Sequence, residues 1–102
     1  MAKLIVLYKK PSDVQAFNEY YFSKHVPIAS TIPGLEGVEV SDGPVGSPQG
    51  ESPYHLVATL SFASMEALQA AMASPEGQKT AADLANFADG GAEILIINPR
   101  SI

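Results

Sequence analysis

The feature that most constrains the fold is an apolar run near the start of the chain, Leu4–Tyr8. Its apolar residues fall on both faces of the segment KLIVLYK, which is typical of a strand that is covered on both sides. The run is too short for the core of a signal peptide or for a membrane span. We therefore expect a buried strand over Lys3–Lys9 in a soluble protein with no membrane partner.

The remaining chain predicts two helical regions and three more strands from its apolar spacing. The first helix is expected over Asp13 to about Val26, with Ser12 and Gln15 as a capping box and a kink at Pro27. The other predicted elements are a helical region over 65–89, which restarts at Ser74-Pro75, strands over 35–43, 54–62 and 92–98, and a mobile loop over 44–53. This β-α-β-β-α-β order predicts a single α+β domain over 1–102 with a ferredoxin-like, four-stranded antiparallel sheet in the order 4-1-3-2.

The last predicted strand raises the question of what covers the sheet. It lies at an edge, yet Ile94–Ile97 make it apolar on both faces, which soluble proteins normally cover. Two helices cover only one face, so the other face, to which we assign Leu4, Val6 and Tyr8, needs another cover. We expect a homodimer in which two sheets pack face to face about a twofold axis.

Composition excludes several classes of partner and chemistry. The chain has 6 basic and 11 acidic residues, a net charge of -5 and no basic cluster, so nucleic acid is not an expected partner. It has no cysteine, which removes disulfides and thiolate chemistry and fits a cytoplasmic protein.

Several short motifs, taken together and in order, resemble the EthD family of dimeric α+β barrel proteins. They are Tyr8–Pro11, Phe17, Tyr21, His25–Pro27 and Ile32–Leu35. The family is named for ethyl tert-butyl ether degradation and is linked to a cytochrome P450 system. The resemblance implies a sheet-mediated dimer with a pocket between sheet and helices in each subunit. Relatives in the wider superfamily include cofactor-independent monooxygenases, polyketide cyclases, isomerases and haem-handling enzymes.

His25 is the principal candidate for catalysis. It lies beside the apolar stripe of its helix and carries an imidazole, which titrates near neutral pH and suits a general base or acid. The alternative is a buried structural histidine that bonds the carbonyl of Ser23, which Pro27 deprives of its helical partner. Both interpretations stay open from the sequence.

Four other side chains are candidates for a site. Tyr8 ends the central strand, where its hydroxyl could orient a ligand, and we group it with His25 as catalytic. Tyr21, Tyr54 and His55 are candidate substrate-binding residues, with His55 on the more polar face of its strand. Packing or interface roles are the alternative for each of them.

Metal and cofactor chemistry is not expected. The chain has only two histidines, and neither has a carboxylate at a metal-binding spacing. Haem is disfavoured because the second helical region has no histidine, and the acidic residues Asp13, Glu19, Glu66 and Asp83 are interpreted as helix-surface charges.

Two functional hypotheses remain. The first is a cofactor-independent enzyme, an oxidoreductase or an isomerase or cyclase, that acts on a hydrophobic, oxygen-bearing small molecule. The second is a non-catalytic accessory protein beside an oxygenase.

Overall fold

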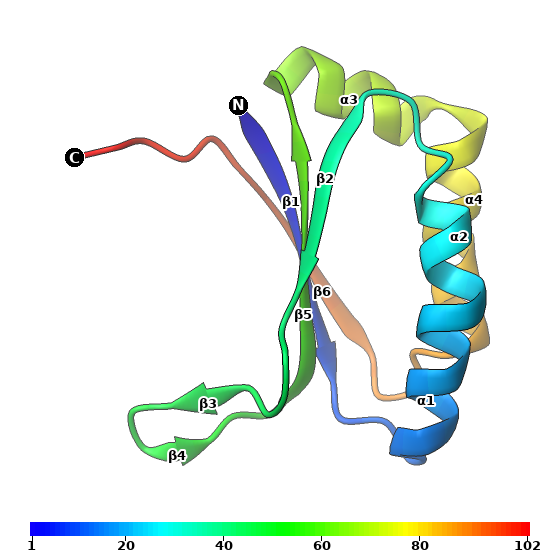
Figure 1. The fold of residues 1–102 in the computed structure, drawn as a ribbon, viewed down its shortest axis with the longest axis vertical. Helices are drawn as coiled ribbons and strands as arrows, with labels where there is room; N and C mark the ends of the chain where they lie inside the picture. Colours follow the sequence, from blue (N-terminus) through cyan, green and yellow to red (C-terminus); the bar gives the residue numbers. More distant parts are fainter.

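A computed structural model describes residues 1–102. Its four-stranded antiparallel sheet has the order β2-β5-β1-β6, so the first strand is central, as predicted. The strands are β1 (Ala2–Lys9), β2 (Leu35–Val40), β5 (Tyr54–Phe62) and β6 (Ala92–Ile97). All helices lie against one face of the sheet (Figure 1), which confirms the ferredoxin-like α+β fold. None of the helices combines the length and the apolar character that a membrane span requires.

The first helical segment is longer than predicted and begins with a different cap. It comprises α1 (Val14–Tyr20), η1 (Tyr21–His25) and α2 (Val26–Ala29). Asp13 caps it by accepting from the amide of Ala16 at 3.0 Å, so the predicted capping box of Ser12 and Gln15 is wrong. Ser12 instead bonds Asp89 in the loop before β6, through both its amide and its hydroxyl.

The middle of this segment is a π-helical turn. The amide of Val26 bonds the carbonyl of Tyr21, five residues back rather than four. Pro27 has no amide hydrogen, and its ring would press on the carbonyl of Ser23 in a regular α-helix. The wider turn absorbs this conflict, and the helix continues to Ala29 instead of ending near Val26.

The second helical region contains α3 (Met65–Ala73), α4 (Pro75–Asp83) and a short 3-10 turn, η2 (Leu84–Asn86). Ser74 caps α4 by accepting from the amide of Gly77 at 3.0 Å, as its position before Pro75 predicts. A Cβ at Gly77 would lie 2.0 Å from the carbonyl oxygen of Ala71, so only glycine fits this corner.

The side chains of β1 face the opposite way from our prediction. Leu4, Val6 and Tyr8 are buried beneath the helices, whereas Ile5 and Leu7 point to the uncovered face and are half-buried. The prediction was wrong because both sets are apolar, and nothing in the pattern says which set meets the helices. The strand β5 places its apolar set, Leu56, Ala58, Leu60 and Phe62, in the core, as predicted.

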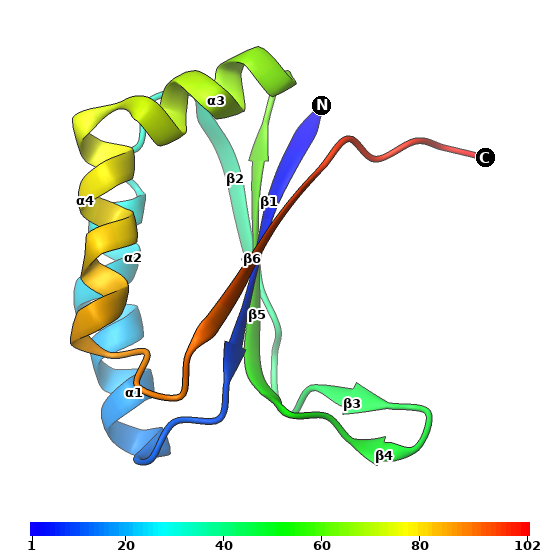
Figure 2. The same ribbon diagram turned by 180° about the vertical axis from the view of Figure 1, so that it is seen from behind.

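The predicted loop 44–53 contains a small hairpin. Its strands are β3 (Gly46–Ser47) and β4 (Gly50–Glu51). Figures 1 and 2 show that this hairpin and the C-terminal segment both project on the side of the sheet opposite the helices. This uncovered side is called the open face below.

Candidate functional site

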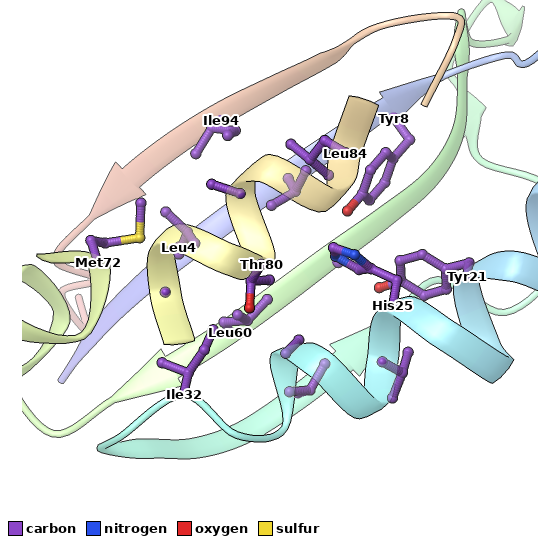
Figure 3. Close-up of a pocket in the computed structure, with 17 residues that line it drawn as sticks. Leu4, Tyr8, Tyr21, His25, Ile32, Leu60, Met72, Thr80, Leu84 and Ile94 are labelled. Atoms are coloured by element: carbon purple, nitrogen blue, oxygen red, sulfur yellow. The ribbon is translucent and has the colours of Figure 1, made fainter. Parts of the chain in front are cut away.

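A narrow cavity lies between the sheet and the helices. Its volume is about 50 Å³, and 14 of its 17 lining residues are hydrophobic. No lysine, arginine, aspartate or glutamate lines it. Figure 3 shows His25, Tyr8 and Tyr21 gathered at one end, and Met72, Leu4 and Ile94 away from them. The cavity therefore suits an uncharged, largely apolar molecule with its polar part near His25.

His25 on η1 faces Asp83 at the end of the neighbouring helix α4. Its Nδ1 lies 2.8 Å from Oδ2 of Asp83, and both residues are buried, with 4% and 6% of their surface exposed. The alternative partner that the sequence left open, the carbonyl of Ser23, is therefore wrong. The wide turn at residues 21–25 directs the imidazole inward, toward α4.

Asp83 is the centre of a hydrogen-bonded cluster and not a surface charge, which corrects our prediction. Its Oδ1 accepts from the hydroxyl of Tyr20 at 2.7 Å and from Nδ2 of Asn86 at 2.9 Å. Burial alone would raise the pKa of this carboxyl, but the hydrogen bonds from Asn86, Tyr20 and His25 outweigh it and lower the pKa. Asp83 is thus ionised at neutral pH and can only accept.

The tautomer of His25 follows from this charge. Since a carboxylate has no proton to give, Nδ1 of His25 carries the proton that is shared with Asp83. The other ring nitrogen, Nε2, has no partner within the chain and belongs to a residue that lines the cavity. Because no fully enclosed side-chain nitrogen lacks a partner, Nε2 borders accessible space, and in the neutral ring its lone pair can accept a proton there.

Two tyrosine hydroxyls share this end of the cavity. Tyr8 and Tyr21 are only 1% and 3% exposed, and neither hydroxyl bonds another group of the protein. No fully enclosed side-chain oxygen or nitrogen lacks a partner, so both hydroxyls must border accessible space. In Figure 3 the two oxygens lie on the side of their rings nearer His25. Burial, followed by the charges of Tyr21 and Asp83, raises the pKa of Tyr8, and burial raises the pKa of Tyr21 to about 12, so both remain hydrogen-bond donors.

Tyr54 and His55 lie elsewhere. They border a more open depression of about 520 Å³ between α1 and the segment 41–45. Nε2 of His55 lies 2.8 Å from Oδ1 of Asn18, and its ring meets that of Phe17 edge-on at 4.9 Å. The pairing of β1 and β5 slips between Tyr8 and Lys9, which leaves His55 without a cross-strand partner. Its predicted place on the polar face with Val57 is therefore wrong.

Sequence reasoning missed Asp83 together with its donors Tyr20 and Asn86. A signal was available: in the helix predicted over 65–89, Asp83 lies three residues after Thr80 and four before the apolar Phe87, on their side. The structure shows that this side is the inward one, since Thr80 lines the cavity and Phe87 is buried, although α4 itself ends at Asp83. The structure contains no group of three or more His, Cys, Asp or Glu side chains that could hold a metal ion.

The arrangement combines one proton acceptor with two donors at one end of an apolar cavity. Nε2 of His25 can take a proton, and the carboxylate of Asp83 stabilises the imidazolium that results. The hydroxyls of Tyr8 and Tyr21 can donate to an oxygen that becomes negative as the proton leaves.

Comparison with known proteins identifies relatives over the whole chain. The EthD domain matches residues 9–91. An uncharacterised 11.0 kDa protein of the thcB-thcC intergenic region of Rhodococcus erythropolis is 39% identical over 103 residues, with 100% of this chain and 98% of that protein covered. The crystal structure of an ethyl tert-butyl ether degradation family protein from Bacillus halodurans matches with a TM-score of 0.89 and 40% identity, over 98% of this chain and 99% of that one.

More distant structures share the fold alone. SnoaB from Streptomyces nogalater, a cofactor-independent oxygenase, has a TM-score of 0.68 and 14% identity, over 99% of this chain and 94% of its own. A dimeric protein of unknown function with a ferredoxin-like fold, from Bacteroides fragilis, has a TM-score of 0.62 and 18% identity, over 94% and 93% of the two chains.

Proposed function

The chain belongs to the EthD family, and we propose that it binds an uncharged, oxygen-bearing apolar molecule in the cavity and removes a proton from it with His25. One observation carries the proposal. A buried imidazole is held by an ionised carboxylate on one side and borders an apolar cavity with its other nitrogen.

The chemical step is a proton transfer. Nε2 of His25 takes the proton of an acidic C–H or O–H bond, and the bonding electron pair stays on the substrate as an enolate or phenolate. The hydroxyls of Tyr8 and Tyr21 hydrogen-bond the oxygen on which the charge collects. No step of this transfer requires an organic cofactor or a metal ion.

Three reaction classes begin with such a proton loss. An enolate or phenolate can react with dioxygen, as in a cofactor-independent monooxygenase, or it can be reprotonated elsewhere or close a ring, as in an isomerase or cyclase. The oxygenase SnoaB shares the fold and makes the oxidoreductase form the first to test, but fold likeness alone does not choose a chemistry.

We also propose that the functional unit is a homodimer. Leu95 and Ile97 are 50% and 39% exposed, and together with Ile5 and Leu7 they form an apolar patch on the open face along β1 and β6. Packing two open faces together would bury these side chains, and the dimeric Bacteroides protein shares this fold.

A second candidate is a non-catalytic accessory protein, and the size of the cavity favours it. Ligand pockets commonly have volumes of roughly 300–1,000 Å³, whereas this cavity holds about 50 Å³. In that case the pair of His25 and Asp83 stabilises the packing of η1 on α4, and a ligand or partner binds elsewhere.

Hydrogen exchange of a neutral ketone separates the two candidates. The probe is 2-tetralone in D2O, whose acidic C1 hydrogens are followed by proton NMR. We expect the wild-type protein to accelerate their exchange above the buffer rate and His25→Ala to abolish the acceleration. His55→Ala, which changes the other histidine, is the matched control and should keep it.

The outcome also tests the accessory role. If His25→Ala exchanges the probe as fast as the wild type, His25 is not the base and the enzymatic proposal fails. No acceleration by any variant, together with a lower melting temperature for His25→Ala, is the result that the accessory role requires.

A further inference from the structure

The edge strand β6 has exposed apolar side chains that the proposed dimer would cover only in part. Four consecutive side chains are exposed: Ile94 by 44%, Leu95 by 50%, Ile96 by 49% and Ile97 by 39%. Successive side chains of a strand point to opposite faces. Leu95 and Ile97 therefore lie on the open face, where a second copy would cover them, whereas Ile94 and Ile96 lie on the helix side, where it would not.

The pairing with β1 places these two isoleucines beside the cavity. Ile94 pairs with Val6 and Ile96 with Leu4, and both β1 residues are buried beneath the helices and line the cavity. Ile94 itself lines the cavity while almost half of it is exposed. Ile94 thus contacts both the cavity and the solvent, which makes the β6 edge a place where the cavity can open to the surface.

The opposite edge of the sheet offers a second place of this kind, with a different character. Val38 on β2 also lines the cavity and is 38% exposed. The exposed carboxylate of Glu36 lies two positions before Val38, whereas the residues that alternate along the helix side of β6, Ala92, Ile94 and Ile96, carry no charge. Of the two sheet edges, β6 therefore offers the more continuous apolar surface to an apolar group that leaves the cavity.

The volume of the cavity makes such an exit necessary for a molecule of ordinary size. About 50 Å³ accommodates only a few non-hydrogen atoms beyond the polar end at His25. Met72, a flexible side chain on α3 that also lines the cavity, lies on the same side as Leu4 and Ile94 in Figure 3.

We propose that the ligand has an apolar tail, such as a linear alkyl chain, that passes Ile94 and lies along Ile96 while its oxygen-bearing head stays at His25. This inference rests on the proposed function, since it assumes that the head binds beside His25. It assigns the exposed Ile94 and Ile96 to substrate binding and the exposed Leu95 and Ile97 to the contact between subunits. The ligand class is therefore a phenol or enol with a flexible apolar substituent.

A series of 4-alkylphenols tests whether an apolar tail binds at the β6 edge. The dissociation constants of 4-ethyl-, 4-butyl- and 4-hexylphenol are measured by calorimetry for the wild type, Ile94→Ser and Val38→Ser. Each buried methylene should tighten binding by about fourfold in the wild type. Ile94→Ser should lose most of the gain in affinity that the wild type shows between 4-ethylphenol and 4-hexylphenol. Val38→Ser, which changes a similarly exposed cavity residue at the other edge, should keep that gain.

Each other outcome overturns a defined part of the proposal. If Val38→Ser loses the gain and Ile94→Ser keeps it, the tail leaves by the β2 edge. If 4-ethylphenol binds and longer chains add no affinity, the proposed tail site is wrong, whereas binding of the head at His25 is still supported. If no phenol binds the wild type, the inference and the proposed function fail together. Ile96→Ser, which lies outside the cavity lining, repeats the test without changing the cavity wall.

Discussion

The two histidines of this chain make the same kind of contact in two different regions. Nδ1 of His25 lies 2.8 Å from a carboxylate oxygen of Asp83, and Nε2 of His55 lies 2.8 Å from the amide oxygen of Asn18. The contact distance does not distinguish them, but the surroundings do. His25 is 4% exposed and its partner is ionised, whereas His55 is half-buried and its partner is neutral.

The difference shows how one residue type becomes a candidate base in one region and a packing contact in the other. Asp83 is held by Tyr20 and Asn86, so its charge is fixed beside His25, and the free nitrogen of His25 borders an apolar cavity. His55 packs edge-on against Phe17 and borders a wide, polar depression. A charged partner and a dry surrounding are what make an imidazole useful for proton transfer.

The largest expected effect is on the partner residues. Asp83→Ala leaves three donors without their acceptor, of which His25 is buried and Tyr20 half-buried, and should lower the free energy of unfolding by about 3 kcal/mol or more. Asn18→Ala removes one neutral, partly buried hydrogen bond and should cost about 1 kcal/mol or less. Urea denaturation of both variants measures the two values. Equal losses of the free energy of unfolding would mean that Asp83 stabilises the fold no more than Asn18 does.

A smaller effect on the free energy of unfolding is expected for Tyr20→Phe, and it should depend on pH. The pKa of Asp83 is lowered from 3.8, so its ionised form stabilises the fold above pH 3.8, and this stabilisation is lost as the pH falls further. Tyr20→Phe removes one hydrogen bond that lowers this pKa. We expect a loss of about 1 kcal/mol at pH 7 that narrows as the pH falls toward 2.

Denaturation at several pH values checks this expectation, with Asn18→Ala as the control. The asparagine does not titrate, so the loss in that variant should stay constant with pH. A constant loss for Tyr20→Phe as well would show that Asp83 does not carry its charge in the folded protein.

The smallest effect is expected beside His55. Nζ of Lys10 lies 3.3 Å from Oε2 of Glu51, and both side chains are more than half exposed. Lys10→Ala should change the free energy of unfolding by about 0.5 kcal/mol or less, because solvent screens such pairs. Thermal denaturation in low and high salt measures it. A loss above about 1 kcal/mol would show that this region is more tightly coupled than its exposure indicates.

The sequence predicted the sheet order, the central strand and the inward helix position of His25, because apolar spacing and element order decide these features. It did not predict which set of β1 side chains meets the helices, since Ile5 and Leu7 are as apolar as Leu4 and Val6. It also missed the slip in strand pairing at His55, which depends on how β1 and β5 meet in three dimensions.

Of the candidate site, the sequence supplied His25, Tyr8 and Tyr21 but not the residue that holds the imidazole. Asp83 lies 58 positions from His25, and an aspartate on a helix is usually solvated. Only the packing of α4 on η1 shows that this aspartate is inside. Tyr54 and His55 were grouped with the site, but the structure puts them at a separate depression.

The π-helical turn at residues 21–25 also bears on how this site could be inherited. A turn that spans five residues has the form of an α-helix that has taken in one extra residue. Removing one residue there would restore the α-helix and leave the segments on either side in place, because the wide turn confines the extra residue to itself. The deletion would change the spacing between Tyr21 and His25 from four residues to three. The geometry of the site can therefore change in a single genetic event that the fold survives, which makes the length of this turn a character to follow among related chains.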